Sequence, residues 1–277
     1  MQAHKLPLSG AKKTNERRRI ILKEGEKAPK VLEVSLSGFS TSIDVHLGAG
    51  AEATIVDVST SKKHAVSVTL QKGSVLTYIS LSRDSARTFT SSVDAGAHMH
   101  WHCTTLGGDG DRHTLISQCI GANAESTIDW IFSADGKEKQ SVSVRNIFDA
   151  AEGSGEITLK GVAEEKAFVT CHGMIEITEK GRGTNTYLTE DVLMLDSTAH
   201  VDAVPALEIR TNDVKASHSA TVSRVTAESL FYLQSRGIDE VKARQMFVEG
   251  FLGDLTERIA DEEIRARVKE AIVREVV

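Results

Sequence analysis

The stretch Leu47-Gly-Ala-Gly50-Ala-Glu-Ala53-Thr-Ile55 decides the fold, because the chain repeats its pattern about every two dozen residues. Each copy joins a short apolar strand, a turn and a strand of alternating polarity, as one coil of a β-solenoid requires. The copies start 23, 23, 27 and 75 residues apart, the last interval being about three periods, and those between residues 130 and 190 are blurred. The further copies are LQKGSVLTY at 70–78, VDAGAHMHW at 93–101, IGANAESTI at 120–128 and LDSTAHVDA at 195–203.

The repeat predicts a mainly β fold in which successive coils stack on one another. A single coil cannot bury its own apolar face, so neighbouring coils share one core. Aromatic residues make up only 5% of the chain, which suits thin and regular coils. The period argues against a left-handed helix of hexapeptides, whose coils are three hexapeptides long. The turn positions carry residues that tolerate positive φ, namely Gly50, Gly73, Gly96 and Asn123.

Alternation within the copies assigns side chains to the two faces of each strand, because successive residues of a strand point to opposite sides. Cys103 continues the inward set, whereas His98, His100 and His102 are predicted to point outward. The inward residues of the aligned copies are Ala53, Ile55, Leu76, Tyr78, Met99, Trp101, Ser126 and Ile128.

The hydrophobic period becomes helical after Val225, so we expect three parts: a basic arm at 1–30, a β-solenoid core at 31–224 and a helical subdomain at 225–277. Thr226 is a plausible N-cap and Gly237 a helix stop. Two apolar stripes are expected to hold these helices to the core: Val241, Val248, Phe251, Leu252, Leu255 and Ile259, then Ile264, Val268, Ile272 and Val276.

Composition and charge exclude several classes of protein. The net charge is −6, and the locally basic segment from Lys5 to Lys30 contains no aromatic residue that could stack on bases, so we expect no nucleic-acid partner. No apolar run approaches the roughly 18 residues of a membrane span, and the start MQAHKLPLSGAKK lacks the apolar region of a secretory signal. Three cysteines without a CxxC pair indicate a reducing compartment. We therefore expect a cytoplasmic protein with no membrane partner.

Residues 200–238 change from alternating strands to a helix and carry three linked motifs. These are Pro205-Ala-Leu-Glu-Ile209, Asp213-Val-Lys-Ala-Ser-His-Ser-Ala-Thr-Val222 and Leu230-Phe-Tyr-Leu-Gln-Ser-Arg-Gly-Ile238. In this order they resemble the C-terminal signature of SufB/SufD proteins, the scaffold subunits of the SUF iron–sulfur cluster assembly machinery. The resemblance implies a right-handed parallel β-helix, a dimer formed through strands at 200–222, and helices that dock a SufC-type ATPase. It also implies a non-catalytic protein that holds a transient iron–sulfur cluster.

By direct motif match, the resemblance assigns cluster assembly to His218, whose neutral imidazole can ligate iron. The structural alternative is a histidine that only packs near the dimer seam. SufB-type proteins carry glutamates where this chain has Ser217 and Ser219, and a cysteine where it has Glu190, a hard ligand that replaces thiolate poorly. Many SufD proteins have a cysteine at Ala216. The chain therefore resembles SufD, or a short SufBD-like protein that works as a homodimer, more than a complete SufB.

Cys103 is the second candidate for cluster chemistry. The segment Leu106-Gly-Gly-Asp109-Gly-Asp-Arg112 resembles the SufB region that follows its sulfur-accepting cysteine, but the aligned slot falls on Thr104. One residue of slip reverses the face of a strand. An inward cysteine beside Trp101 is more often a small core residue than a sulfur carrier. Cys119 and Cys171 offer less, and which thiol matters stays open.

His98, His100 and His102 form the best purely local metal pattern, with His113 nearby. Imidazoles two residues apart on one strand face can share a transition metal. The other interpretation is an exposed polar face whose histidines happen to alternate, and it is favoured because no carboxylate or cysteine completes the set at close spacing.

Partner binding is assigned to the helical region, and the chain itself is expected to bind no nucleotide because it lacks a Gly-x-x-x-x-Gly-Lys-Ser/Thr loop. The candidate docking residues are Leu230, Phe231, Tyr232, Phe247 and Phe251. One alternative is a module that recruits the ATPase without touching a cluster. Another is a β-helix carbohydrate-active enzyme, but its carboxylates should recur at one solenoid position, which is not true of Asp94, Asp109, Asp111, Glu125 and Asp129. The dimer partner, itself or a SufB/SufD paralogue, stays open, as do the cluster type and the sulfur donor.

Overall fold

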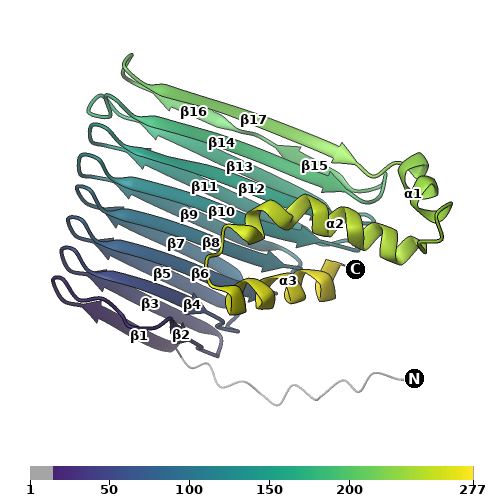
Figure 1. Cartoon of the computed structure of the whole chain (residues 1–277), viewed down its shortest axis with the longest axis horizontal. Helices are drawn as coiled ribbons and strands as arrows, with labels where there is room; N and C mark the ends of the chain where they lie inside the picture. The colour runs from purple at the N-terminus through teal and green to yellow at the C-terminus, as the bar shows by residue number, and fades with distance from the viewer. Residues whose placement is uncertain (1–14, 277) are drawn as a thin grey trace.

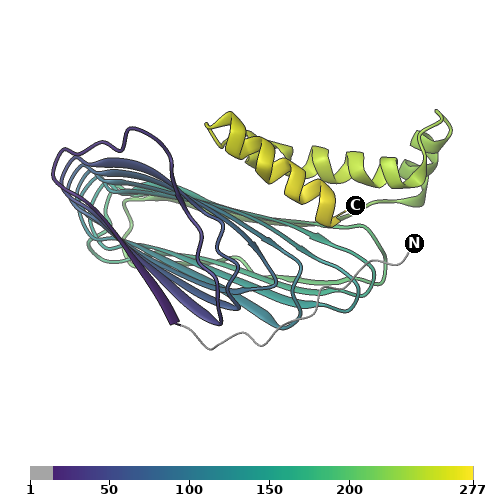
Figure 2. The same cartoon turned by 90° about the horizontal axis from the view of Figure 1, so that it is seen from below.

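The computed structural model describes residues 15–276 and contains two sheets of parallel strands, stacked coil upon coil, with three helices on one side (Figures 1 and 2). Sheet A has the order β1 (Asn15–Leu22), β3 (Ser40–Leu47), β5 (Lys63–Leu70), β7 (Ala86–Val93), β9 (Asp111–Cys119), β11 (Lys139–Phe148), β13 (Phe168–Ile177) and β15 (His200–Ala203), and β16 (Ala206–Ile209) also pairs with β13. Sheet B has the order β2 (Leu32–Val34), β4 (Glu52–Asp57), β6 (Val75–Arg83), β8 (His98–Leu106), β10 (Glu125–Ala134), β12 (Ser154–Ala163), β14 (Asn185–Met194) and β17 (Lys215–Arg224). The predicted β-solenoid is therefore confirmed.

One corner of the solenoid is built by residues with positive φ, as the repeat predicts. Each donates its backbone N–H to the next coil, as Gly73 does to the carbonyl of Ala95 at 2.9 Å. Glu152 (φ +58°) and Gly183 (φ +79°) continue this corner through the region where no copy is recognisable in the sequence. The predicted corner residues have φ values of +66° at Gly50, +68° at Gly73, +60° at Gly96 and +57° at Asn123.

The copy at 195–203 belongs to the opposite corner, so its alignment with the others is wrong. It leaves β14 of sheet B and enters β15 of sheet A, whereas the other copies lead from sheet A into sheet B. Both corners consist of a turn followed by an alternating strand, and this shared pattern explains the misalignment.

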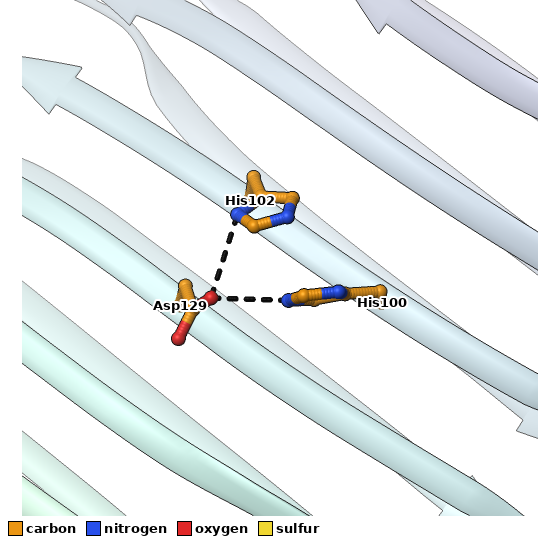
Figure 3. A group of neighbouring side chains, drawn as sticks. All are labelled: His100, His102 and Asp129. Atoms are coloured by element: carbon orange, nitrogen blue, oxygen red, sulfur yellow. Dashed lines mark hydrogen bonds and ion pairs between the residues drawn. The ribbon is translucent and has the colours of Figure 1, made fainter. Parts of the chain in front are cut away.

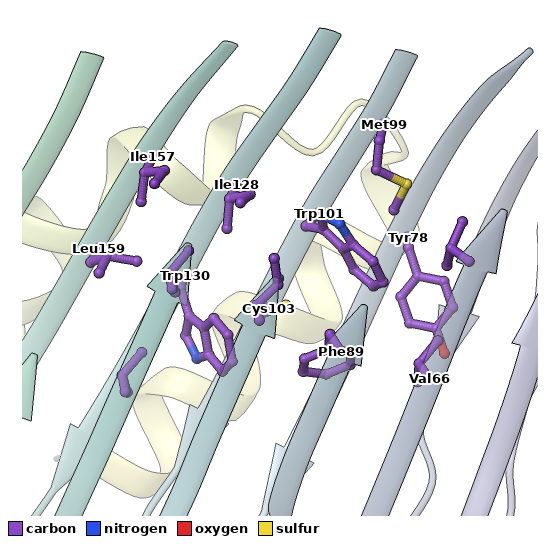
Figure 4. Packing of buried hydrophobic residues seen from close by; sticks show 14 of the residues in the cluster. Val66, Tyr78, Phe89, Met99, Trp101, Cys103, Ile128, Trp130, Ile157 and Leu159 are labelled. Carbon is purple, nitrogen blue, oxygen red and sulfur yellow. The ribbon is translucent and has the colours of Figure 1, made fainter. Parts of the chain in front are cut away.

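The predicted inward face is confirmed, because the register stacks those residues directly above one another. Met99 pairs with Leu76 and Ser126, and Trp101 pairs with Tyr78 and Ile128. All are buried in the space between the sheets. Four aromatic residues fill the centre of this core, with ring centroids 5.1 to 5.7 Å apart for Tyr78–Trp101, Phe89–Trp101 and Phe89–Trp130 (Figure 4).

The C-terminal helices cover the outer face of sheet B. They are α1 (Ala227–Gln234), α2 (Glu240–Glu257) and α3 (Glu262–Val276), and α2 and α3 lie against β10 and β8 (Figure 2). A second core forms there, in which Ile131 and Val162 of the sheet meet Leu252 and Val268 of the helices. Thr226 caps α1 as predicted, accepting the Ser229 N–H at 3.1 Å. The two predicted stripes hold except at Val241, which lies in the first turn of α2 and is 62% exposed, and the side chain of Val276 lies outside the described part of the chain.

The segment predicted as a basic arm contributes to the solenoid. Strand β1 pairs in parallel with β3 along its whole length, so sheet A already begins inside residues 1–30. Arg17, Arg18 and Arg19 lie exposed on this edge strand, and Arg17 pairs with Asp44 at 2.5 Å. The rest of the predicted arm, residues 1–14, lies outside the described residues. Between residues 15 and 276, no helix is both long and apolar enough to cross a bilayer.

Candidate functional site

His218 lies on the last strand of the solenoid, at the edge of sheet B. The register pairs it with Leu188, which is fully buried inside the solenoid, so His218 occupies the inward-facing column of side chains. Strand β17 pairs with β14 on one side, and within the described chain no further coil follows it. Strand β17 forms this open end of the solenoid (Figure 1), and His218 is consequently exposed there.

Glu190 lies one coil below on the inward face of β14, where the register pairs it with Ala220, and it is fully buried. Its Oε1 accepts a hydrogen bond from the N–H of Gly173, and Oε2 has no hydrogen-bond partner among the described residues. Burial raises the pKa of Glu190 to about 7, although the Gly173 bond opposes this and Asp202 adds a smaller upward shift. The carboxyl group is therefore poised between its neutral and charged forms at neutral pH.

The three cysteines are all free and buried. Burial raises the pKa of the Cys103 and Cys171 thiols well above the usual range and that of Cys119 to about 12. Because the thiolate is the form that attacks and binds metals, none of these side chains is activated for sulfur chemistry in this state. Cys103 does face inward beside Trp101, as predicted for a core residue, and the neighbouring Thr104 is also buried.

The three histidines of β8 do not act as one set. His98 is exposed and contacts Glu125, with Nδ1 3.0 Å from Oε2. His100 Nε2 lies 3.0 Å and His102 Nδ1 3.4 Å from Oδ2 of Asp129 on β10 (Figure 3). No carboxylate lies at close spacing in the sequence, but the parallel register brings Asp129 beside His102 from the next coil and so adds a carboxylate in space.

Burial also distinguishes these histidines, because helices cover part of the face predicted to be exposed. His102 is buried, whereas the His100 side chain keeps 32% of its surface accessible. Burial, assisted by the nearby His100 and opposed by Asp129, lowers the pKa of His102 to about 3, so its ring is neutral at physiological pH. Arg258, which caps the C-terminus of α2, places Nη1 2.7 Å from Oδ1 of Asp129 and 3.3 Å from Oγ1 of Thr158.

The predicted docking residues divide into two groups. Phe231 and Tyr232 of α1 are 69% and 54% exposed. Leu230, Phe247 and Phe251 are partly buried against the second core, and Phe251 also faces Lys160, whose Nζ lies 5.0 Å from the ring centroid. A mostly apolar groove of about 710 Å³ separates α1 from α2 and is lined by Glu228, Ser229, Phe231, Tyr232, Leu233, Ser235, Met246 and Phe247.

A buried polar network inside the solenoid was not predicted from the sequence. Asp57 Oδ2 lies 2.9 Å from His64 Nε2, 3.0 Å from the Tyr78 hydroxyl and 3.9 Å from Arg87 Nη1. Burial alone would raise the pKa of Asp57, but the His64 hydrogen bond and the Arg87 charge hold it below its usual value. The network is closed to solvent, so its role is structural. Its only sequence signal is a run of polar residues at inward positions.

The family described as "SUF system FeS cluster assembly, SufBD core domain" matches residues 31–251. The iron-sulfur cluster assembly protein SufD of Escherichia coli is 32% identical over 169 residues, which cover 60% of this chain and 40% of that protein. An iron-sulfur cluster assembly SufBD family protein of Mycobacterium tuberculosis is 33% identical over 181 residues, covering 62% and 45%. The chain thus spans less than half the length of these relatives. Because the match covers most of its coils and the start of its helices, the chain belongs to the SufBD core family of the SUF iron–sulfur cluster assembly system.

Proposed function

We propose that this chain is a non-catalytic scaffold subunit of a SUF iron–sulfur cluster assembly complex. It dimerises through residues 200–222, with itself or with a SufB/SufD-like paralogue, and docks a SufC-type ATPase through its C-terminal helices. The observation that carries the proposal is the last coil, in which His218 stands on the inward face and no coil of the described residues 15–276 covers it. Its buried thiols suit a reducing compartment, and we place its work in the cytoplasm.

The two ends of the solenoid differ in how they treat their unpaired strand edges. An open edge invites pairing with another chain, and charged side chains discourage it. At the first coil the edge strand β1 carries Arg17, Arg18 and Arg19. At the last coil the inward column of β17 instead carries small and apolar residues around His218, including Ala220 and Val222, which is 48% exposed. The last coil is therefore the end suited to a second subunit.

A cluster precursor at this seam would meet two groups of the chain. His218 offers an exposed imidazole, a ligand for iron that can release it again. Glu190, one coil below, offers a carboxyl group whose pKa burial raises to about 7, so that it can give up its proton when a cation approaches. Neither is a thiolate, and the three thiols are buried. Where the partner is a SufB/SufD-like paralogue, we propose that the paralogue contributes the sulfur ligands of a transient cluster.

The docking surface for the ATPase is the groove between α1 and α2. Helix α1 contains no buried residue, so its aromatic side chains contribute little to the fold of the isolated chain. Aromatic residues exposed beside a mostly apolar groove are typical of a protein-binding surface. Phe231 and Tyr232 are the anchors we propose, whereas Phe251 mainly holds α2 to sheet B.

The first experiment measures the mass of the chain by size exclusion with light scattering, alone and with the SufC-like ATPase of the same genome. We expect a dimer that takes up two ATPase chains. Val222→Arg is expected to give a monomer, whereas Ile116→Arg, at an exposed site on β9 in the middle of sheet A, keeps the dimer. Phe231→Ser is expected to lose the ATPase, whereas Val241→Ser on exposed α2 surface retains it. A monomer that ignores the ATPase would contradict the proposal.

A module that recruits the ATPase without holding a cluster is the alternative, and the burial of all three thiols favours it. Anaerobic cluster reconstitution separates the two functions. A scaffold gains iron and sulfide absorbance that His218→Ala reduces, while both chains still bind the ATPase. A recruiting module binds the ATPase equally well but gains no cluster with or without His218.

A further inference from the structure

We propose that His100, His102 and Asp129 form a binding site for a divalent first-row transition metal ion on the outer face of sheet B. This site is separate from the seam near His218 and does not depend on the proposed scaffold function. Its residues come from adjacent strands, β8 and β10, in which the parallel register places His102 beside Asp129 (Figure 3). Two histidines and one carboxylate are a ligand set found for zinc and for non-haem iron.

The distances already resemble those of a coordination shell. Donor atoms about 2.1 Å from one ion lie about 3.0 to 3.4 Å apart at octahedral to tetrahedral angles. Oδ2 of Asp129 is 3.0 Å from Nε2 of His100 and 3.4 Å from Nδ1 of His102. All three donor atoms lie within 4.8 Å of one another, so a small rotation of the imidazoles brings them around one ion.

The surroundings fix the ligands and leave access to them. Arg258 contacts Oδ1 of Asp129, which orients the carboxylate and leaves Oδ2 facing the histidines. Such contacts from outside the ligand shell commonly orient metal-binding side chains. His102 and Asp129 are buried and held in place, whereas the partly exposed His100 provides the entry side and room for solvent ligands. The positive charge of Arg258 limits the affinity, because it shares the carboxylate.

The competing explanation is a structural tether. Two imidazole N–H groups can donate to one carboxylate oxygen, and Arg258 then ties α2 to sheet B without any ion. The tether accounts for the Asp129–Arg258 contact. It leaves unexplained why two histidine rings with centroids 3.9 Å apart also hold their nitrogens and Oδ2 of Asp129 within 4.8 Å of one another, as the ligands of one ion must be.

Cobalt binding to the full-length chain, stripped with a chelator, tests the site. Co²⁺ reports ligation through its visible absorption, and Zn²⁺ should displace it, since zinc binds such sites more tightly. We expect one Co²⁺ for each chain, with a rise in melting temperature on binding. His100→Ala is the least disruptive ligand variant because this side chain is partly exposed, and it should weaken binding at least tenfold, as even the loss of supporting residues does. Asp129→Asn should do the same.

His98→Ala is the matched control, since His98 lies on the same strand and face but pairs with Glu125 instead. It should keep the Co²⁺ spectrum and affinity within twofold of the parent chain. Equal binding by the parent chain and His100→Ala would overturn the proposal, because the ion would then be held elsewhere. Absence of a Co²⁺ spectrum at submillimolar metal near neutral pH would also overturn the proposal. It would show that His100, His102 and Asp129 serve only as a structural tether between α2 and sheet B.

Discussion

Replacing Glu190 with glutamine tests whether burial keeps this carboxyl group protonated near neutral pH. The unfolded chain releases the proton near the ordinary value of 4.5, whereas the folded chain keeps it until a pH of about 7. Between these values the folded state binds more protons than the unfolded state. The free energy of unfolding therefore falls as the pH rises through this window, and the loss is complete above the folded pKa.

The structure sets the size of this effect. A shift from 4.5 to about 7 corresponds to a little over 3 kcal/mol at 1.36 kcal/mol for each pH unit. Part of this loss falls below pH 5, so about 2 kcal/mol is expected between pH 5 and pH 8. Glutamine keeps an acceptor for the Gly173 N–H but cannot ionise. The variant should lack this component of the pH dependence.

Thermal unfolding between about pH 5 and pH 8 measures the difference, since about 2 kcal/mol corresponds to roughly 4 to 8 °C for a chain of this size. The melting temperature of the parent chain should fall more steeply with pH than that of Glu190→Gln. Glu156→Gln, an identical change at an exposed site on β12, is the control and should follow the parent curve. Parallel curves for Glu190→Gln and the parent chain would refute the reasoning, because the carboxyl group would then titrate alike in both states.

Three further predictions concern packing and thiol chemistry. Gly161→Ala should lower the free energy of unfolding by about 1–3 kcal/mol, because the added Cβ would lie 1.9 Å from Cε2 of Phe132. Gly250→Ala, on the exposed surface of α2, should instead raise it by about 0.5–1 kcal/mol. Equal effects of the two variants in urea unfolding would argue against this packing. Lys160→Ala removes the hydrogen bonds from Nζ to Asp254 at 2.8 and 2.9 Å, so limited proteolysis should release the C-terminal helices faster. An unchanged rate of cleavage would mean that the Lys160–Asp254 contact does not hold the helices to sheet B. A thiol reagent should label none of Cys103, Cys119 and Cys171 in the native chain and all three in urea. Rapid labelling of the native chain would show that at least one of these thiols is accessible.

The sequence predicts the core of the coils well because two periodicities coincide there. Alternation along a strand and the repeat interval between coils together fix the column that contains Tyr78 and Trp101. The same reasoning fails at the fifth copy, because both corners of a coil have the same pattern of turn and strand. The corner at Glu152 is missed because a charged residue there gives no sign of positive φ.

The candidate metal site could be predicted only in part. The spacing of His100 and His102 shows in the sequence, since it arises within one strand. Asp129 lies one coil away and Arg258 on a helix more than a hundred residues later, so neither contact has a local signal. The burial of His102 likewise depends on the helices that return across sheet B. For His218, the motif located the residue, but its exposure at the open end follows only from the register with β14.

The return of the helices changes how the stack of coils shares its stability. In a linear array each coil contacts only its neighbours, so single coils can open nearly independently from either end. Here Arg267 of α3 reaches Glu33 of β2 at 2.7 Å, Arg258 reaches Asp129 of β10, and Lys160 of β12 reaches Asp254. These cross-links join the coil of β2 to the coils of β10 and β12, with which β2 does not pair, in one cooperative block. Among the described residues, the coil of β15 to β17 pairs with a neighbouring coil on one side only, so we expect it to be the unit with the lowest free energy of local opening.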